Sequence, residues 1–313
     1  MRVSNLFELI VFVFCFLSIL GFFGRYWWIC DLSNHFRFQY FIVLFSASLF
    51  FMLLKKWKLV LMSFSFAFFN FFFIFPYFIG SEISATSGRS YRILTSNVYA
   101  GNRDYGKVIS LVSRLKPDFM VFEEVNSNWW NELLKFQPEF PFIEKSIRED
   151  CFGIAFFSKI PIEKFEIVFI GKAGVPTILA HTTLEGKKVK FIAAHTLPPI
   201  SKEYSELRDD QISEIQDLIS NGLGEIILIG DLNATPWSCV FRDLIRKSKL
   251  RDSRLGFGIN PTWRTELWPL WIPIDHCLIS SGTGILDIKS CTDVGSDHYP
   301  LMVDFSFVSP NLP

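Results

Sequence analysis

The chain has 313 residues, half of them hydrophobic, and its 31 basic and 31 acidic side chains give a formal net charge of zero. This length allows one large or two ordinary domains, and the charge balance argues against the strongly basic surface of many nucleic-acid binders. The composition is uneven, because 21 of the 36 Phe residues lie in the first 80 positions. That skew divides the chain into an apolar N-terminal part and a more ordinary remainder.

Three apolar runs occupy the N-terminal part, at residues 6–23, 41–54 and 59–79. The third has no charged residue over a length that crosses a hydrocarbon core of ~30 Å, so it predicts a transmembrane helix. The first carries only Glu8 and predicts another span; a signal peptide is the alternative, although no small-residue cleavage site follows it. The second run is the shortest and predicts either a short span or a re-entrant segment. Residues 1–80 are therefore expected to form a membrane region with two to three transmembrane helices.

The distribution of basic residues predicts an orientation in the membrane. If all three runs cross, the N-terminus and the loop at residues 55–58 share one side, and everything after residue 80 lies on the other side. Arg2 and three lysines of the loop then slightly outnumber the basic residues near the opposite side. By the positive-inside rule, the part after residue 80 is expected outside the cytoplasm, an assignment that changes if the second run does not cross.

A small, polar segment at residues 81–90 predicts a linker, and residues 91–313 are predicted to form one domain able to bury its own core. From Gly88 onward the chain has 25 basic and 28 acidic side chains, a balance of −3. A cluster of six basic residues lies within 242–254 and is typical of either a solvated helix face or a phosphate-binding patch. Six cysteines show no metal-binding spacing, and the last four allow any pairing.

Strands and helices alternate irregularly in residues 91–313. Strand-length apolar runs lie at residues 91–99, 118–125, 152–158, 165–171, 177–184, 189–196, 225–231, 274–280 and 299–307. Helical patterns lie at residues 104–115, 128–136, 203–219 and 238–249. A hairpin connection is expected at residues 185–188. Hairpins mixed with strand–helix–strand units predict an α+β fold with mixed sheets covered by helices, rather than a doubly wound parallel sheet.

Polar residues stand at the ends of six of these runs. They are Asn97, Glu124, His195, Asp231 with Asn233, Asp275, and Asp297 with His298. Each has an ordinary explanation, such as a turn cap, an exposed strand end or a surface histidine. An acid inside an apolar run, as at Asp275, nevertheless costs free energy unless it is paired or bound to a metal. Six such positions at strand ends together indicate one site.

Metal-assisted cleavage of a phosphoester is the chemistry that uses this set. A hard cation such as Mg²⁺, or alternatively Mn²⁺, prefers oxygen ligands together with water and substrate phosphate, and Glu124, Asn97 and Asp297 offer such oxygens. A carboxylate base is needed to activate the attacking water, and Asp231 is suitable. The remaining catalytic candidates would stabilise charge on the phosphorus oxygens or orient the donor that does so: Asn233, His195, His298 and its expected partner Asp275.

The motifs LTSNVYAGN, PDFMVFEEV, AAHTLPP, GDLNATPWS, PIDHCLIS and GSDHYPL together resemble the endonuclease/exonuclease/phosphatase superfamily. This superfamily includes pancreatic-type deoxyribonucleases, apurinic endonucleases, neutral sphingomyelinases and inositol-polyphosphate 5-phosphatases. The resemblance covers residues 91–308. It implies a four-layer sandwich of two mixed sheets flanked by helices, here preceded by transmembrane helices, and a metal-dependent hydrolytic site.

Matched motif by motif, the resemblance implies a role for each candidate. Asn97 would lie near metal and phosphate, Glu124 and Asp297 would belong to the metal site, and His195 would act as an acid or phosphate ligand. Asp231 with Asn233 would match the water-activating acid and its phosphate-binding neighbour, and Asp275 with His298 the Asp–His pair. Two positions depart from the pattern: Tyr99 stands where some members carry an acid, and Glu123 stands where glutamine is common.

The leading hypothesis is a membrane-anchored, Mg²⁺-dependent phosphodiesterase, nuclease or phosphatase. Its substrate would be nucleic acid, or a lipid or small phosphoester; the balance of −3 favours a long polyanion only weakly, and a tether raises the local concentration of lipid. The Pro-bounded, Trp-rich segment at residues 261–273 lies beside Asp275 and is a candidate pocket wall. The competing hypothesis is a non-catalytic, membrane-tethered binding protein. No protein partner can be inferred, and the membrane partner is the lipid bilayer.

Overall fold

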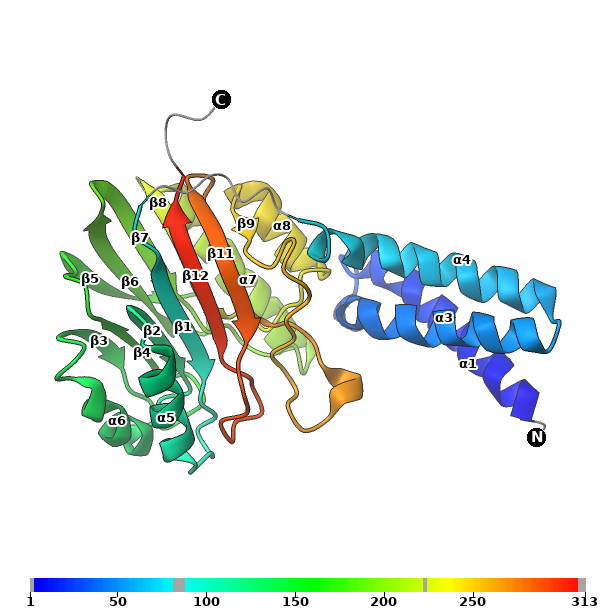
Figure 1. The fold of residues 1–313 in the computed structure, drawn as a ribbon, viewed down its shortest axis with the longest axis horizontal. Helices are drawn as coiled ribbons and strands as arrows, with labels where there is room; N and C mark the ends of the chain where they lie inside the picture. The colour runs from blue at the N-terminus through cyan, green and yellow to red at the C-terminus, as the bar shows by residue number, and fades with distance from the viewer. Residues whose placement is uncertain (1–2, 81–87, 222–223, 309–313) are drawn as a thin grey trace.

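The structure, a computed structural model, describes residues 3–80, 88–221 and 224–308. Helices of the N-terminal part project from one side of a sandwich of β-strands (Figure 1). The predicted linker at residues 81–90 lies largely outside the described residues. All six cysteines are described, and all are free.

The N-terminal part contains the long helices α1 (Val3–Leu20), α3 (Arg37–Leu53) and α4 (Trp57–Ile74). Short helical segments connect or extend them: η1 (Gly21–Phe23), α2 (Trp28–Leu32), η2 (Ser33–Phe36) and η3 (Phe75–Tyr77). Three helical segments are long and apolar enough to cross a membrane, at Asn5–Phe23, Trp28–Leu53 and Trp57–Tyr77. The N-terminus and the turn between α3 and α4 lie at the end far from the strands (Figure 1).

The sequence shows a second apolar run of only 14 residues. In the structure the corresponding helical segment, Trp28–Leu53, has 26 residues. Its first part contains polar side chains that bond within the protein. Arg37 donates from Nη1 to the Ser18 carbonyl at 2.7 Å and from Nη2 to Asn34 Oδ1 at 2.5 Å. Asn70 on α4 accepts a further hydrogen bond from Arg37 at 3.2 Å. These internal bonds satisfy groups that otherwise cost free energy in an apolar surrounding.

The sandwich contains two mixed six-stranded sheets. The strands of the first sheet lie in the order β11-β12-β1-β2-β4-β3. They are β1 (Tyr91–Asn97), β2 (Phe119–Glu123), β3 (Phe142–Ser146), β4 (Ile154–Ser158), β11 (Thr283–Ser290) and β12 (Leu301–Phe307). The strands of the second sheet lie in the order β5-β6-β7-β8-β10-β9. They are β5 (Lys164–Ile170), β6 (Val175–Leu184), β7 (Lys187–Ala193), β8 (Glu225–Asp231), β9 (Arg251–Asp252) and β10 (Asp275–Ile279). Among the described residues, only β1 with β2 and β7 with β8 pair in parallel.

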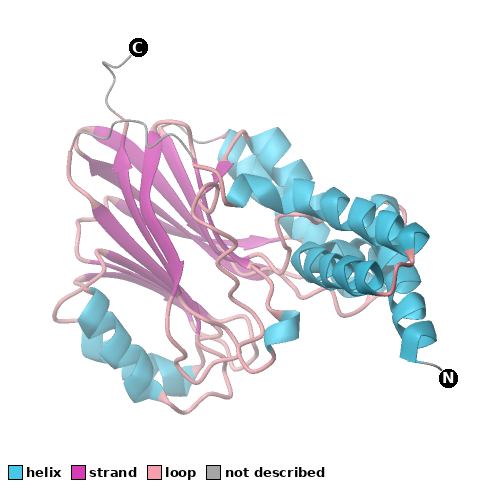
Figure 2. Ribbon diagram, turned by 45° about the vertical axis from the view of Figure 1, so that its right-hand side comes forward, coloured by secondary structure: helices cyan, strands magenta, loops and turns pink. Residues whose placement is uncertain are grey.

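Helices cover the outer face of each sheet, so that the sandwich has four layers (Figure 2). The helices α5 (Tyr105–Leu115) and α6 (Ser127–Leu133), followed by η4 (Leu134–Phe136), cover the first sheet, and α7 (Lys202–Ser220) and α8 (Cys239–Ser248) cover the second. Along β2, Phe119 and Val121 face the other sheet while Met120 and Phe122 face the helices. Burial of both faces explains why the central strands are continuous apolar runs.

Nine strands and four helices agree with the sequence-based prediction to within a few residues, and β8 agrees at both ends. The strands β3, β9 and β11 were not predicted, and all three lie at sheet edges. Edge strands are shorter or more polar than central ones, so their sequences lack the apolar run that marks a buried strand. The connection between β6 and β7 is the two residues Glu185 and Gly186, both with positive φ, as a tight hairpin requires.

The N-terminal helices bind the sandwich through polar as well as apolar contacts. Trp237 donates from its indole nitrogen to the Phe73 carbonyl at 3.1 Å. Asp31 is buried and accepts a hydrogen bond from the backbone nitrogen of Cys239, at the start of α8, at 2.8 Å. The buried Arg208 of α7 lies 3.7 Å from the same carboxylate. These contacts place α2 against α7 and α8.

We expect Asp31→Ala to weaken this contact by roughly 1–3 kcal/mol, because it leaves the buried backbone nitrogen of Cys239 without its acceptor and removes a charge that faces the buried Arg208 guanidinium. Asp243→Ala is the matched control: it removes another acid that pairs with the N-terminal part, through Arg25 at 2.6 Å, but that pair is solvent-exposed. The control is expected to cost no more than about 1 kcal/mol. Thermal unfolding of both full-length variants in detergent measures the difference, and equal losses would contradict the assignment.

Candidate active site

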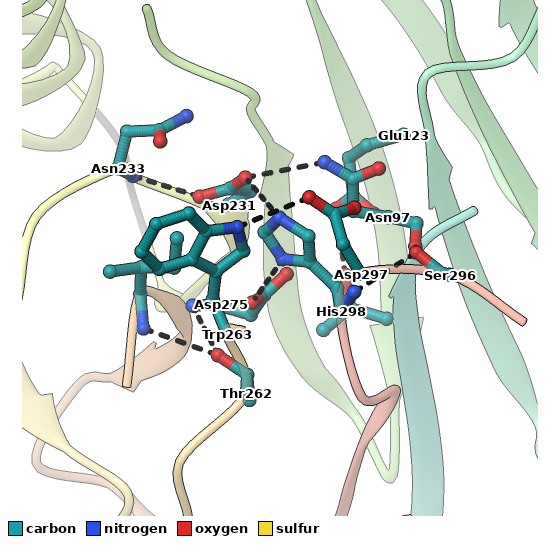
Figure 3. Close-up of polar contacts among 12 residues, drawn as sticks. Asn97, Glu123, Asp231, Asn233, Thr262, Trp263, Asp275, Ser296, Asp297 and His298 are labelled. Atoms are coloured by element: carbon teal, nitrogen blue, oxygen red, sulfur yellow. Dashed lines mark hydrogen bonds and ion pairs between the residues drawn. The ribbon is translucent and has the colours of Figure 1, made fainter. Parts of the chain in front are cut away.

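The parallel strand pairs of the two sheets end at the same edge of the sandwich. β1 ends at Asn97, β2 is followed by Glu124, and β8 ends at Asp231. β10 runs antiparallel to β8 and pairs its first residue, Asp275, with Asp231. His298 precedes β12, whose first residue pairs with Thr95 of β1. The fold therefore brings together side chains from positions 97 to 298 (Figure 3).

Gly230 allows the end of β8 to lie close to Ala194, which follows β7, and to Glu123 of β2. Its φ is +131°, and a Cβ atom on it would lie 2.2 Å from the Ala194 carbonyl oxygen and 2.9 Å from a Glu123 carboxylate oxygen. A larger residue would push the end of β8 away from the strands that face it. The glycine before Asp231 thus helps to set the position of that carboxylate.

Asn97 connects two of the carboxylates. Its amide nitrogen donates to Glu124 Oε1 at 3.0 Å and to Asp231 Oδ2 at 3.3 Å, while its oxygen accepts from the Tyr99 backbone nitrogen at 3.0 Å. Glu124 also accepts from the Ala100 backbone nitrogen at 3.0 Å. Glu124 has a φ of +61°, an uncommon conformation for a side chain other than glycine. The hydrogen bonds hold Glu124 in this orientation.

Asp231 is almost completely buried. Its Oδ1 accepts from the Asn233 backbone nitrogen at 2.8 Å, and its Oδ2 faces the Nε2 atoms of His195 and His298 at 3.6 and 3.8 Å. Burial raises the pKa of Asp231 to about 8, the Asp275 carboxylate adds to the rise, and the His298 cation opposes it. In the protein without a metal, this carboxyl therefore exchanges its proton near neutral pH.

His298 and Asp275 form a buried pair, with His298 Nδ1 2.9 Å from Asp275 Oδ2. Burial alone would lower the pKa of His298, but the carboxylates of Asp275 and Asp231 outweigh it and raise the pKa to about 10. Burial likewise favours the neutral form of Asp275, and His298 outweighs this effect and lowers its pKa. The pair therefore holds the imidazole in its charged form, with Nε2 directed at Asp231.

His195 differs from His298 in having no acid bonded to its ring. It is buried, its ring packs against Phe152 with centroids 5.3 Å apart, and its Nδ1 has no hydrogen-bond partner among the described residues. Burial lowers the pKa of His195 to about 4, and the nearby His298 cation adds to the effect. This imidazole is neutral at physiological pH.

Asp297 and Asn233 complete the predicted set, in different ways. Asp297 accepts a hydrogen bond from the Trp263 indole nitrogen at 3.2 Å. The side chain of Asn233 points away from Asp231 (Figure 3) and donates to the Thr196 carbonyl at 2.8 Å. The predicted residues are thus all near one another, but the amide of Asn233 is turned outward from the cluster.

Several residues at the site were not identified as candidates from the sequence. Thr262 Oγ1 accepts from the Asp275 backbone nitrogen at 3.1 Å, and Ser296 Oγ donates to the Asn97 carbonyl at 2.8 Å and accepts from the His298 backbone nitrogen at 3.1 Å. Ser296 lies inside the GSDHYPL motif, and its position next to Asp297 and His298 could have identified it as a residue of the site. Thr262 lies in the segment at residues 261–273, which the sequence marked as a candidate pocket wall, but nothing in that segment singled out this hydroxyl as a partner of Asp275.

Glu123 lies beneath the cluster and is completely buried. Thr95 donates to its Oε1 at 2.7 Å, and its Oε2 has no hydrogen-bond partner among the described residues. Burial raises the pKa of Glu123 well above its usual range, and the Asp275 carboxylate adds to the rise. The surroundings of Glu123 therefore favour the neutral carboxylic acid, which can both donate and accept a hydrogen bond, as a glutamine side chain can.

The basic cluster at residues 242–254 is not a single patch. Arg254 is fully buried beneath the site, where it donates to His276 Nδ1 at 3.0 Å and to the Asp275 carbonyl oxygen. Arg242 and Arg246 lie on α8, and Arg246 pairs with Asp243 at 3.0 Å. The buried member of the cluster supports β10 from below and is separate from the basic residues of α8.

The carboxylate oxygens at this edge are suitable ligands for a hard cation. Burial raises the pKa of Glu124, and the neighbouring Asp297 carboxylate contributes to the rise, so a cation near both acids would relieve their repulsion. Asp231, Asp275 and His298 also have ligand atoms within 4.8 Å of one another, a spacing that could hold a metal. His298 is a poor ligand, however, since its ring is held protonated and its Nδ1 is bonded to Asp275. We therefore favour the oxygen donors near Glu124.

Comparison with known proteins supports the architecture. Residues 94–298, more than half of the chain, match the model of the Endonuclease/Exonuclease/phosphatase family. The chain belongs to this family. Its members are generally metal-dependent phosphoester hydrolases, and the match spans the strands that position the cluster. No curated protein sequence matches the chain.

Solved structures share the fold at low sequence identity. D. rerio TDP2 in complex with a single-stranded DNA product is 15% identical, with a TM-score of 0.60, covering 70% of this chain and 100% of that one. Staphylococcus aureus beta toxin is 20% identical, with a TM-score of 0.55, covering 68% and 99%. Sphingomyelinase C from Streptomyces griseocarneus is 15% identical, with a TM-score of 0.53, covering 69% and 99%. This likeness establishes the fold alone.

The pKa of His195 predicts a stability change in acid. Above its ordinary value of 6.5 the ring is neutral in both folded and unfolded protein; between pH 6.5 and about 4 only the unfolded chain takes up the proton. Stability should therefore fall as the pH drops through this window, by an amount on the order of 3 kcal/mol from this residue. Unfolding in EDTA should show a smaller loss for His195→Gln than for the parent. His181→Gln, at a half-exposed histidine, is the control, and parallel curves for all three proteins would contradict the prediction.

Proposed function

We propose that the protein is a membrane-anchored, metal-dependent phosphoester hydrolase in which Asp231 activates the attacking water. The observation that carries this proposal is geometric: the buried Asp231 carboxylate accepts from the Asn233 backbone nitrogen and faces Nε2 of His298, which Asp275 holds in place. Burial raises the pKa of this carboxyl to about 8. A general base works best when its pKa lies near the working pH. Within the fold of this family, the arrangement supports hydrolysis better than binding alone.

The neighbours of Asp231 are suited to a charged phosphorus centre. His298 presents a cationic Nε2 toward the site, where it can donate a hydrogen bond to a phosphoryl or leaving-group oxygen as negative charge develops. His195 is neutral, so we assign it the role of a hydrogen-bond donor to phosphate rather than that of a cation. Asn233 uses one amide hydrogen on the Thr196 carbonyl, so contact with phosphate would use its second hydrogen after the side chain turns toward the cluster.

Glu124 and Asp297, with Asn97, are the residues that would hold Mg²⁺, or Mn²⁺ in its place. When bound, such a cation neutralises phosphate charge and polarises the phosphorus centre. Asn97 contributes chiefly by orienting Glu124 and Asp231 through its amide nitrogen, and its oxygen retains a lone pair beyond the bond from Tyr99. In the proposed reaction the residues orient the phosphoester, and Asp231 accepts a proton from water as the water oxygen bonds to phosphorus. The bond from phosphorus to the leaving oxygen breaks as His298 Nε2 donates a proton to that oxygen.

The proposed organisation is a membrane region at residues 1–80, a linker at 81–90 and a catalytic domain at 91–313. The three apolar helices support a multi-pass anchor, and the basic loop between α3 and α4 favours a cytoplasmic position for the end far from the strands. The catalytic domain would then lie on the non-cytoplasmic side. The substrate is a nucleic acid, or a lipid or small phosphoester; structural relatives include both a protein bound to DNA and a sphingomyelinase.

Asp231→Asn removes the proposed base with little change in shape. We expect kcat on bis(p-nitrophenyl) phosphate with Mg²⁺ to fall about 10²–10⁴-fold, the usual contribution of a general base. The assay uses the full-length protein in detergent, with Asp287→Asn, at a half-exposed acid of β11, as the matched control. Undiminished activity of Asp231→Asn would refute its role. A parent inactive on this ester, on DNA and on lipid vesicles would instead favour a non-catalytic binding protein.

Glu124→Gln tests the metal site. It removes one charge from the oxygen donors, so we expect Mg²⁺ affinity to fall at least about tenfold and the rate to recover partly at high Mg²⁺. Calorimetric titration measures the affinity independently of the rate. Glu139→Gln, at an exposed acid, should leave both unchanged. A Glu124→Gln protein with the affinity of the parent would require another ligand set, such as the one around Asp275 and Asp231.

A further inference from the structure

A large apolar pocket lies between the N-terminal helices and the loop beside the active site. Its volume is about 700 Å³, within the range of pockets that enclose drug-sized ligands. Phe14 of α1 and Ile42 and Val43 of α3 contribute to one wall, and Pro261, Leu270 and Trp271 to the other. The pocket walls are therefore mainly hydrocarbon and aromatic surface.

Among the polar side chains in the walls, Gln39 and Asn260 each donate a hydrogen bond within the protein. Gln39 donates to the Trp271 carbonyl at 2.8 Å, a bond that ties the two walls together. Asn260 donates to the Phe257 carbonyl at 3.0 Å. A ligand of this pocket must consequently gain its binding energy from apolar contact, since few polar groups remain to recognise it.

The position of the pocket indicates which apolar ligand reaches it. The wall from α1 and α3 belongs to segments long and apolar enough to cross a membrane, and Ile42 is 42% exposed. On the opposite wall Trp268 is 71% exposed and Trp271 37%, and tryptophan is the residue that favours the boundary between lipid and water. Once the helices are inserted, the surrounding solvent on this side is lipid, and its acyl chains are the abundant apolar ligand.

The loop that forms the second wall also forms part of the active site. It runs out from the sandwich beside the near ends of the apolar helices (Figure 1). Pro261 lines the pocket, the next residue, Thr262, bonds to the Asp275 backbone, and Trp263 bonds to Asp297. Trp263 also pairs with His298 through an isolated β-bridge. Ligand and reaction centre are thus on two sides of one short loop.

We propose that this pocket holds an acyl chain of a membrane lipid, and that the phosphoester headgroup of the same lipid is the substrate of the site. The choice of substrate rests on the proposed function, whereas the binding of the chain does not. The acidic balance of −3 in the chain from Gly88 onward agrees with a substrate that is concentrated by the bilayer rather than by a basic surface.

Lipid binding can be tested without catalysis. The full-length protein in nanodiscs containing phosphatidylcholine with a photoreactive acyl chain should form cross-links in the peptides that contain Val43 and Leu270. Ile42→Trp fills the pocket from its exposed wall and should reduce these cross-links. Ile19→Trp is the matched control, because Ile19 is 46% exposed on α1 and does not line the pocket. Cross-links that are equal in the two variants, or no more frequent in the pocket than elsewhere on the helices, would overturn the inference.

The substrate is tested with two esters that share one reaction centre, methyl p-nitrophenyl phosphate and hexadecyl p-nitrophenyl phosphate. We expect kcat/KM to be at least about tenfold higher for the hexadecyl ester, through burial of its chain, and Ile42→Trp but not Ile19→Trp to remove that preference. Leu270→Trp, from the opposite wall, should act as Ile42→Trp does. Equal kcat/KM values in the parent would overturn the lipid assignment and leave the hydrolase intact. Inactivity on both esters would refute the hydrolase, with the cross-links still deciding the pocket.

Discussion

The site depends on one constraint of the fold: the two parallel strand pairs, β1–β2 and β7–β8, end at the same edge of facing sheets. Asn97, Glu124 and Asp231 meet only because these ends coincide, and Asp275 and His298 are added by the strands that begin there. The resulting cluster is buried and rich in carboxyl groups. One charged imidazole compensates only part of their charge, which is why an added cation suits this edge of the sandwich.

The central strands and the site could be predicted from the sequence because both depend on burial. A strand buried on both faces, such as β8, is a continuous apolar run, and a polar residue that ends such a run stands out. The edge strands β3, β9 and β11 have weaker patterns because water or loops cover one side of them. The sequence marked the segment that contains Thr262 as a candidate pocket wall beside Asp275, but it did not identify the hydrogen bond that the Thr262 hydroxyl accepts from the Asp275 backbone, because a threonine next to tryptophan and proline has no distinctive pattern.

The length of the second N-terminal apolar segment could not be predicted from hydropathy alone. Asp31, Asn34 and Arg37 precede the second apolar run and make the helical segment appear short, yet in the structure each of these side chains forms hydrogen bonds within the protein. Partners of this kind come from elements distant in the chain, such as the backbone of Cys239. Hydropathy along the sequence measures each residue without its partners, so it underestimates a helix whose polar groups are bonded within the fold.

The same contacts connect the N-terminal helices to the site. Arg208 lies 3.7 Å from Asp31 and donates to the Asn233 carbonyl at 3.2 Å, two residues beyond Asp231. On the other side, Gln39 bonds to the loop that carries Trp263 and Thr262. The helices thus support both segments that flank the cluster, the turn after β8 and the loop before β10. A role limited to tethering would need neither contact, since a flexible linker alone keeps a domain near a membrane. The contacts instead give the site a fixed orientation relative to the three apolar helices, which the proposed approach of a lipid headgroup to Asp231 would require.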